Sequence, residues 1–345
     1  MGGRRTKVGL VGYGVIGRRV ADAIVLQPDM ELVGIADVAA DRRIGQATAK
    51  GHRLYSAVTE ATEPMRSAGL SITGALEDLV EASELIVDCT PKKIGARNAE
   101  TYRRLDKAFI VQGGEKHDLA GHSFVAEASF DSAIGKRATR VVSCNTTSIV
   151  RTLGALKRAS LHGKARGTLL RRATDPWESH LGGIMNTLVP EPVIPSHQGP
   201  DAQHVDPDLD VVTIGIRVPE TVGHLHAWSV QLTREVTKDE VLAAFAASPR
   251  IVQIDSRTGL EAINSVKEWM ADIGRPHDNL YEVALWSDSL AVRGSELFYT
   301  YMVDNQAIVI PENVDAIRAL AGTASSAESM RTTNETLGIG TLQRT

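Results

Sequence analysis

Cys144 is the residue of this chain whose setting best suits covalent chemistry. It stands in the run Ser143-Cys144-Asn145-Thr146-Thr147, directly after a β-rich stretch and before residues 148–161, whose pattern predicts a helix. A thiol at a helix N-terminus has its thiolate stabilised by free N–H groups and by the positive end of the helix dipole. A lone cysteine is also often an inert, buried side chain, so both interpretations of Cys144 stay open at this point. Cys89 lacks a comparable polar setting, and we interpret it as structural.

A nucleophilic thiol needs a partner that moves protons. His224 and His226 enter a predicted strand, and because side chains alternate along a strand, both point to the same face. An imidazole there can accept the thiol proton and later the proton of a thiohemiacetal. A hydrogen-bonded structural histidine is the alternative. A metal site is a further one, but no third ligand is evident and two cysteines are too few for a cysteine-rich zinc site, so no metal is predicted.

A glycine-rich turn marks a nucleotide site near the start of the chain. The run Gly12-Tyr13-Gly14-Val15-Ile16-Gly17 follows a predicted strand and opens a predicted helix. In that context Gly12 permits the tight turn, Gly14 lets the backbone approach a pyrophosphate, and Gly17 lets the helix pack closely on the strand. The helix N-terminus then offers its N–H groups to the phosphates. A glycine turn that binds no nucleotide is the alternative.

Asp37 supports the nucleotide interpretation, because it ends the second predicted strand about 20 residues after the last glycine of the turn. A carboxylate there accepts hydrogen bonds from the ribose hydroxyls and repels a 2′-phosphate, which favours NAD over NADP. Arg42 and Arg43 follow closely and are suited to a 2′-phosphate, so NADP stays open as the cofactor.

The elements that must position these residues fall into two groups. In the first half, short β-rich runs alternate with helical patterns, which predicts βαβ units and a parallel, doubly wound sheet. The strands of this half are predicted at residues 7–11, 31–36, 85–88, 108–111 and 138–143, with a first helix at 17–26. In the second half the runs are longer and alternate apolar with polar residues, as antiparallel strands with one covered face do. These strands are predicted at residues 210–218, 225–232, 282–287 and 297–301.

Three further segments have distinct patterns. Thr237 and Glu240 have the spacing of a capping box at the start of a helix. Residues 190–207 are rich in proline and show no periodicity, which predicts a long ordered loop. Residues 311–321 begin a C-terminal helix with proline in its first turn.

Composition limits the classes of function. The 345 residues carry a net charge of -4 and 43% apolar residues, which favours two globular domains and gives no global electrostatic reason to bind nucleic acid or a membrane surface. Local basic pairs remain suited to a small phosphate. No apolar run is long enough to span a bilayer, and the N-terminus does not have the pattern of a signal peptide. With two cysteines in the chain, a disulfide framework is not expected. A cytoplasmic location is therefore expected.

Taken together, these motifs make the chain similar to the archaeal-type (type II) glyceraldehyde-3-phosphate dehydrogenases over nearly its whole length. The resemblance rests on ordered runs that include the glycine turn, the Cys144 run and the following stretches: Asp88-Cys89-Thr90-Pro91, Gln112-Gly113-Gly114-Glu115-Lys116, Arg171-Arg172-Ala173-Thr174-Asp175-Pro176, Pro195-Ser196-His197-Gln198-Gly199-Pro200-Asp201 and Ile310-Pro311-Glu312-Asn313-Val314-Asp315-Ala316-Ile317-Arg318.

The resemblance implies a two-domain oxidoreductase. Its Rossmann domain would span residues 1–143 and be completed by a C-terminal helix at 311–340, and an α+β catalytic domain with a largely antiparallel sheet would span 144–304. The implied reaction oxidises a phosphorylated aldehyde: a Cys144 thiohemiacetal passes hydride to NAD or NADP, and inorganic phosphate cleaves the thioester to 1,3-bisphosphoglycerate. The expected assembly is a homotetramer with a glycolytic role.

The same resemblance implies roles for particular residues. Cys144 takes the place of the nucleophile, His224 that of the base, and Asn145 helps to stabilise the oxyanion. Arg171 and Arg172 are bidentate donors suited to phosphate. Further phosphate contacts are expected from Thr146, Thr147, His197 and Thr221. Cofactor contacts are expected from Thr90, Pro91 and Gly113, and from Asn305 or Gln306 at the nicotinamide amide.

Departures from the family pattern cluster around these contacts. Gln198 stands where the family usually has a second histidine, Lys92-Lys93 where it usually has Glu-Gly, and Ser148 where glycine follows the threonine pair. Two other hypotheses therefore stay open. One is a paralogous aldehyde dehydrogenase or acyl-phosphate reductase with another phosphorylated substrate. The other is an NAD-binding redox sensor that uses Cys144 without turnover.

Overall fold

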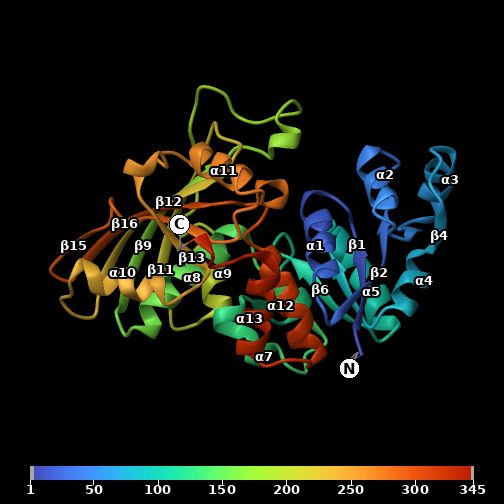
Figure 1. Cartoon of the computed structure of the whole chain (residues 1–345), viewed down its shortest axis with the longest axis horizontal. Helices are drawn as coiled ribbons and strands as arrows, with labels where there is room; N and C mark the ends of the chain where they lie inside the picture. Colours follow the sequence, from blue (N-terminus) through green and yellow to red (C-terminus); the bar gives the residue numbers. More distant parts are fainter. Residues whose placement is uncertain (1–3, 343–345) are drawn as a thin grey trace. The chain divides into compact units, whose positions relative to one another are not determined.

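The computed structural model describes residues 4–342, and the chain folds as two structural units. The first unit combines the residues up to Val142 with Ile310–Leu337, and the second combines Ser143–Val309 with the segment that follows Leu337. Figure 1 shows both units with their elements labelled. Within the described residues, no helix is long and apolar enough to cross a membrane.

The first unit is built on an eight-stranded sheet in the order β4-β3-β2-β1-β5-β6-β8-β7, and every pairing in it is parallel. Its strands are β1 (Thr6–Val11), β2 (Met30–Asp37), β3 (Leu54–Ser56), β4 (Ile72–Ala75), β5 (Leu85–Asp88), β6 (Ala108–Gln112), β7 (Ser123–Phe124) and β8 (Ala138–Val141). The order reverses between β1 and β5, and the carboxyl ends of strands at such a point are where open parallel sheets bind ligands.

Helices cover this sheet, as the βαβ pattern predicts. They are α1 (Val15–Val25), α2 (Arg42–Ala49), α3 (Thr59–Ser67), α4 (Leu76–Ala82), α5 (Ile94–Arg104), α6 (His117–Ala120), α7 (Ala126–Ala133), α12 (Ile310–Ala321) and α13 (Ser326–Leu337). Leu79 and Val80 of α4 and Ala99 and Tyr102 of α5 join the core beneath them. In Figure 1 the red α12 lies beside the blue α1, so the end of the chain packs against the first βαβ unit.

The second unit contains a mixed sheet in the order β10-β11-β9-β12-β16-β14-β13, with β15 paired to β16. Its strands are β9 (His162–Arg172), β10 (Val189–Pro190), β11 (Asp210–Val218), β12 (His224–Leu232), β13 (Ile251–Ile254), β14 (Val283–Trp286), β15 (Ala291–Arg293) and β16 (Glu296–Val303). The pairs β9–β11 and β13–β14 are parallel and the other pairings are antiparallel. The predicted fold class, a parallel Rossmann sheet with a largely antiparallel second sheet, is confirmed.

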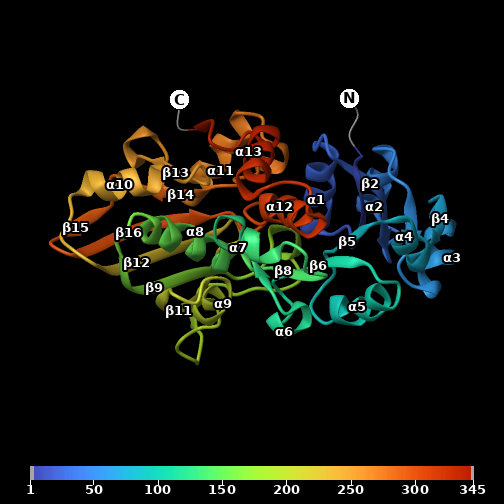
Figure 2. The ribbon, with the colours of Figure 1, turned by 90° about the horizontal axis from the view of Figure 1, so that it is seen from below.

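The helices of the second unit are α8 (Cys144–Arg158), α9 (Gln198–Val205), α10 (Lys238–Ala246) and α11 (Ile263–Asp272), with short 3-10 turns at η1 (Pro176–Glu178), η2 (Ser256–Thr258) and η3 (Pro276–Asp278). In Figure 2, α8 runs along the sheet, and it contacts β9, β14 and β16. The residues of α8 from Asn145 to Leu156 are all buried. The first residues of α8 are therefore held on a rigid element.

Some sequence expectations are confirmed and others are wrong. The capping box at Thr237 and Glu240 is present at the start of α10. The expected loop at residues 190–207 is wrong in its last part, because α9 forms there, with its proline in the first turn where the missing N–H costs nothing. The C-terminal segment holds two helices instead of one, because the chain turns at Gly322, whose φ of 63° suits glycine. The strand β9 was not expected.

Candidate active site

Cys144 is the first residue of α8 and lies half-buried after the end of β8. Ser143 caps the helix, and its side-chain oxygen accepts the Thr146 N–H at 3.3 Å. The Asn145 N–H lowers the pKa of the Cys144 thiol, as expected of a thiol at a helix N-terminus with free N–H groups. The cap at Ser143 therefore fixes the backbone that carries the thiol.

Burial dominates the ionisation of this thiol. It raises the pKa of Cys144 to about 11, although Arg172, the Asn145 N–H and Arg171 each lower the pKa and Asp304 raises it. The net direction is opposite to the one that the helix N-terminus alone predicts, because desolvation of the thiolate outweighs these favourable charges. The charges of the two arginines thus partly offset the rise in the pKa of the thiol that burial causes.

His224 begins β12 and is buried. Its Nδ1 accepts the Arg172 backbone N–H at 3.0 Å, so the neutral ring carries its hydrogen on Nε2. Burial, followed by Arg172, His226 and Arg171, lowers the pKa of His224 well below its usual value. The ring is therefore a neutral Nε2–H donor. For Nε2 to accept a proton, the ring hydrogen would have to move to Nδ1, and the hydrogen bond from the Arg172 N–H would be lost.

His226 lies two residues further along the same strand and is fully buried. Its Nε2 lies 2.8 Å from Asn145 Oδ1, and its Nδ1 lies 2.8 Å from the Tyr301 hydroxyl. Burial, followed by Arg171, lowers the pKa of His226 to about 3. Of the two histidines, this one is held by side chains on both ring nitrogens and contacts Asn145, the residue next to Cys144.

Arg171 and Arg172 end β9, where β12 runs alongside. Both affect the pKa of Cys144 and of His224, so their charges act on the same small region. Each also has a carboxylate partner, Glu191 for Arg171 and Asp175 for Arg172, the latter at 2.9 Å. The two arginine side chains are therefore positioned by carboxylates of the second unit.

Several unpartnered buried polar atoms belong to expected substrate or cofactor contacts. Arg171 Nε, Arg172 Nε, Thr147 Oγ1 and Asn305 Oδ1 are buried and have no hydrogen-bond partner among the described residues. Buried polar groups are nearly always paired in folded proteins, and exceptions call for a ligand or water. The Gln198 side chain is a further case, since both its oxygen and its nitrogen are unpartnered. These atoms indicate a site that is complete only with a polar ligand.

The other expected phosphate contacts differ in exposure. Thr146 is fully buried and its hydroxyl lies 3.0 Å from that of Ser143. His197 precedes α9 and is exposed, and Thr221 is half-buried between β11 and β12. For His197 and Thr221, the role of phosphate contact stays a prediction.

The first unit carries the glycine turn at the carboxyl ends of β1 and β5. Gly12 has a φ of 87°, a side chain at Gly17 would meet the Gly12 carbonyl oxygen, and a Cβ at Gly14 would meet nothing within 4 Å. Open space at Gly14 beside the N-terminus of α1 leaves backbone N–H groups accessible to a pyrophosphate. The residues present therefore fit a dinucleotide.

Asp37 ends β2 beside this turn. Its carboxylate accepts the N–H groups of Tyr13 at 2.6 Å, Val38 at 2.7 Å and Ala39 at 2.8 Å. Three of its roughly four acceptor sites are thus occupied by backbone, which fixes the carboxylate and leaves room for one ribose hydroxyl.

The remaining cofactor candidates are spread over both units. Thr90 and Pro91 follow β5, where Thr90 N–H donates to Asp88 at 2.9 Å, and Gly113 follows β6. Asn305 follows β16 in the second unit and is buried, and its side-chain oxygen is unpartnered among the described residues. That oxygen is an acceptor suited to a carboxamide NH2.

Sequence reasoning missed several residues of the site. Arg217 of β11 pairs in register with Arg171 and affects its pKa, Asp304 raises the pKa of Cys144, and Tyr301 holds His226. Their strands were expected, but which residues face one another depends on the register between β9, β11, β12 and β16. No local motif signals that register.

Comparison with known proteins agrees with this geometry. Residues 143–272 match the family model described as glyceraldehyde 3-phosphate dehydrogenase, C-terminal domain. The chain is 45% identical over 341 residues to a glyceraldehyde-3-phosphate dehydrogenase of Pyrobaculum calidifontis, covering 97% of this chain and 98% of that protein. Relatives of the same name from Metallosphaera sedula and Halobacterium salinarum are 43% and 41% identical, covering 97% and 96% of this chain and 98% and 99% of those proteins. The chain belongs to the glyceraldehyde-3-phosphate dehydrogenase family.

Proposed function

We propose that this chain oxidises glyceraldehyde 3-phosphate, using NAD or NADP and inorganic phosphate, to 1,3-bisphosphoglycerate. The observation that carries the proposal is the grouping of Cys144 with Arg171, Arg172 and neutral His224 in the second unit. A thiol, permanent cations and a neutral donor are the groups that covalent oxidation of a phosphorylated aldehyde requires. The relatives that match the chain over nearly its whole length carry the name of this activity.

The covalent step belongs to Cys144. Its thiolate attacks the aldehyde carbon, the C–S bond forms, and the carbonyl π electrons move to oxygen to give a thiohemiacetal oxyanion. Donors that can stabilise this oxyanion are the Asn145 side-chain NH2 and the Nε2–H of His224. In this scheme His224 acts as a neutral donor, and the prediction that it acts as a base requires the other tautomer.

The cofactor, when bound, accepts the hydride that converts the thiohemiacetal into a thioester. Gly12, Gly14 and Gly17 would hold its pyrophosphate, and Asp37 its ribose. The unpartnered Asn305 oxygen would accept a hydrogen bond from the nicotinamide amide. NAD is the cofactor that Asp37 favours, because its carboxylate repels a 2′-phosphate.

Two phosphates must be bound in the second half of the reaction. We assign the unpartnered Nε atoms of Arg171 and Arg172 and the Thr147 hydroxyl to phosphate oxygens. Thr146, His197 and Thr221 are further candidates for these oxygens. Inorganic phosphate then attacks the thioester carbonyl, and the C–S bond breaks to return the Cys144 thiolate.

A related reaction on another phosphorylated aldehyde is the second candidate. The buried, unpartnered amide of Gln198 favours it, because this residue stands where the family usually has histidine and its amide offers both a donor and an acceptor to a substrate.

A homotetramer and a cytoplasmic location are also proposed from the family. Light scattering tests the assembly, and cell fractionation tests the location.

The deciding experiment measures reduction of NAD and of NADP with a series of phosphorylated aldehydes, with and without inorganic phosphate. We expect turnover of glyceraldehyde 3-phosphate that depends on phosphate and is abolished in Cys144→Ala. Phosphate-independent turnover would contradict the proposal, turnover only of another aldehyde would favour the second candidate, and cofactor binding without any turnover would favour a redox sensor.

A further inference from the structure

A buried chain of side chains connects β16 to the residue that follows the nucleophile. His226 and Tyr301 are direct neighbours across the β12–β16 pairing, and both are fully buried. The imidazole reaches the Tyr301 hydroxyl on one side and Asn145 Oδ1 on the other, each at 2.8 Å. The three residues thus form one continuous hydrogen-bonded line within the second unit.

The protons along this line can be placed from donor and acceptor chemistry. Asn145 Oδ1 only accepts, so His226 Nε2 must carry the hydrogen between them. A neutral imidazole has one N–H, so Nδ1 accepts and the Tyr301 hydroxyl donates. Ser148 does not compete, because its hydroxyl donates to the Asn145 carbonyl at 2.8 Å and lies further, at 3.3 Å, from Tyr301.

We propose that Tyr301, through His226, sets the orientation of the Asn145 side-chain amide and so makes Asn145 an oxyanion donor. With Oδ1 held by His226, the amide presents NH2 on its other side, and no described residue accepts from that nitrogen. A reversed amide would present oxygen instead and would repel a developing oxyanion. Tyr301 and His226 are positioning residues in this scheme, which rests on the proposed function.

The test compares Tyr301→Phe with Tyr299→Phe. Both tyrosines are buried in β16 on the same face, but the Tyr299 hydroxyl has no hydrogen-bond partner among the described residues. In Tyr301→Phe we expect kcat to fall about tenfold or more, a part of the roughly 10²–10³-fold cost of losing one oxyanion donor. The KM for the aldehyde and the rate of Cys144 alkylation by iodoacetamide should stay unchanged, because neither develops an oxyanion. Tyr299→Phe should keep the wild-type kcat.

A double-mutant cycle and a spectroscopic measurement complete the test. In an Asn145→Ala background, Tyr301→Phe should have no further effect on kcat. NMR of protein with 15N-labelled histidine should show His226 with its hydrogen on Nε2 in the wild type. A wild-type kcat in Tyr301→Phe, additive effects in the cycle, or a hydrogen on Nδ1 would each overturn the inference. A wild-type enzyme without phosphate-dependent turnover would instead count against the proposed function, and the NMR result would still decide the amide orientation.

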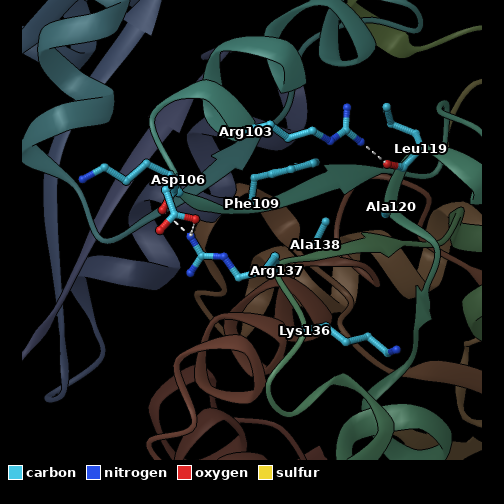
Figure 3. Close-up of a pocket in the computed structure, with 9 residues that line it drawn as sticks. Arg103, Asp106, Phe109, Leu119, Ala120, Lys136, Arg137 and Ala138 are labelled. Carbon is cyan, nitrogen blue, oxygen red and sulfur yellow. Dashed lines mark hydrogen bonds and ion pairs between the residues drawn. The ribbon is translucent and has the colours of Figure 1, made fainter.

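A separate observation concerns a cavity of about 450 Å³ in the first unit. Four cationic side chains line it, Arg103, Lys107, Lys136 and Arg137, against the single carboxylate of Asp106. Figure 3 shows Arg103 extended across the cavity above Phe109, and Arg137 turned to Asp106. The excess of positive charge is local, because the chain as a whole carries -4.

Three of these cations lack a carboxylate partner among residues 4–342. Lys107 donates to the backbone carbonyls of Glu81 and Ser83. Arg103 donates to the Leu119 carbonyl at 2.5 Å and its guanidinium lies 5.4 Å from the centre of the Phe109 ring, which holds it in place without neutralising it. The Lys136 ammonium contacts no acceptor in that part of the chain. A guanidinium held in place beside further unneutralised cations, in a cavity of this size, suits a small anion.

The cavity is separate from the nucleotide turn. Lys107 and Arg137 directly precede β6 and β8, so the cavity lies at the amino edge of the parallel sheet, whereas the glycine turn follows the carboxyl end of β1. A strand as long as β6 spans roughly 16 Å at about 3.3 Å per residue. We propose that this basic cavity binds a compact polyphosphate anion.

Calorimetric titration of inorganic triphosphate tests this second proposal, with NAD and inorganic phosphate present to occupy the active site. We expect binding that weakens as salt is raised and that falls about tenfold or more in Arg103→Ala and in Lys136→Gln. Arg104→Ala is the matched control, because Arg104 is the next residue of α5 and pairs with Glu77 outside the cavity. Equal affinity for ATP would show recognition of the phosphate chain, and tighter binding of ATP with the same variant effects would identify a nucleotide as the source. No measurable binding, or equal affinity in all variants, would overturn the proposal.

Discussion

The reactivity of Cys144 reflects two opposing effects on one sulfur atom. Burial disfavours the thiolate, while Arg172, Arg171 and the Asn145 N–H favour it. Burial has the larger effect, and the net result is that the pKa of the thiol is raised to about 11. A half-buried thiol of this kind stays protonated near neutral pH until a substrate or cofactor changes its surroundings. The two arginines therefore lower the pKa of the Cys144 thiol in addition to their proposed role in binding phosphate.

This balance predicts a pH dependence of Cys144 alkylation. Because only the thiolate reacts, the rate constant for iodoacetamide in the free enzyme should rise about tenfold per pH unit from about pH 7 to about pH 9, without levelling off. Arg172→Leu removes a charge that lowers the pKa of the thiol, so the rate near pH 8 should fall further. Stopped-flow measurement of alkylation checks both results, and a plateau below about pH 8 would show that the thiol pKa is lower than proposed.

We propose that discrimination between NAD and NADP depends on a second small group of residues. Asp37 is held by three backbone N–H groups, whereas Arg42 is exposed and has no hydrogen-bond or ion-pair partner among the described residues. Arg43 differs, because its guanidinium donates to Asp41 at 2.9 Å. Of the two arginines, Arg42 is the one whose charge remains unpaired among the described residues, in the helix that follows Asp37.

Replacement of Arg42 by alanine should therefore lower kcat/KM for NADP about twofold to fivefold, the range of one exposed charge contact, and leave that for NAD unchanged. Arg43→Ala is the comparison variant and should change the ratio of the two cofactors less. Steady-state kinetics with each cofactor measures the effect. An equal loss with NAD and NADP would show that Arg42 acts on the fold instead of on a 2′-phosphate.

At the level of secondary-structure elements, α12 is tied into the first unit by polar side chains as well as by packing. Glu312 accepts the Ala126 N–H at 2.6 Å, and Asn313 exchanges amide hydrogen bonds with Gln112. Arg318 is buried and donates to both oxygens of Asp29, at 2.7 Å each. These residues belong to the run that resembles the family, and in the structure they anchor a helix from the end of the chain.

Loss of the Arg318 contacts should destabilise the first unit. Arg318→Met removes a buried cation and leaves the partly exposed Asp29 without its partner, so we expect a loss of about 2–4 kcal/mol in the free energy of unfolding. Arg331→Ala is the control, because Arg331 makes an exposed pair with Glu335 on α13 that should contribute about 0.3–0.5 kcal/mol. Urea denaturation measures both, and equal effects would mean that the Arg318 network adds little to stability.

Across the folded chain, buried histidines make stability depend on pH. Burial is the main cause that lowers the pKa of His226 to about 3 and of His122 to about 4, and it also lowers the pKa of His224. Below the ordinary histidine pKa of about 6.5 the unfolded chain therefore binds protons that the folded chain refuses. The contribution of these residues to stability is complete above about pH 6.5 and is lost as the pH falls toward about 4.

A matched pair of variants isolates this effect from that of the carboxylates. Each such histidine adds a slope of up to about 1.4 kcal/mol per pH unit between about pH 6.5 and its folded pKa. His122→Asn should therefore show a shallower fall in unfolding free energy between about pH 6 and about pH 4.5 than the wild type, whereas substitution of the exposed His180 by glutamine should not. Denaturant titrations at several pH values give the slopes, and parallel curves for all three proteins would refute the assignment.

Predictability differed between local and long-range features. The glycine turn, the strand endings at Asp37 and Asp88 and the helix that begins at Cys144 depend on neighbours along the chain, and their positions could be predicted from residue types. The helix α9 was missed because its proline and those that precede it obscure the pattern, and β9 was missed because glycine and charged residues interrupt its alternation. Both elements are stabilised mainly by tertiary packing, which overrides weak local preference.

The fold class and the family were determined by residue types at fixed spacing, and the same patterns single out Cys144 as the candidate nucleophile, so the linear chain was enough for these predictions. The state of those residues was decided by the three-dimensional structure: burial outweighs the helix N-terminus at the Cys144 thiol, His224 is held as an Nε2–H donor, and His226 fixes Asn145. These properties depend on desolvation and on strand register. Both arise from residues far apart in the chain, so no local pattern contains them.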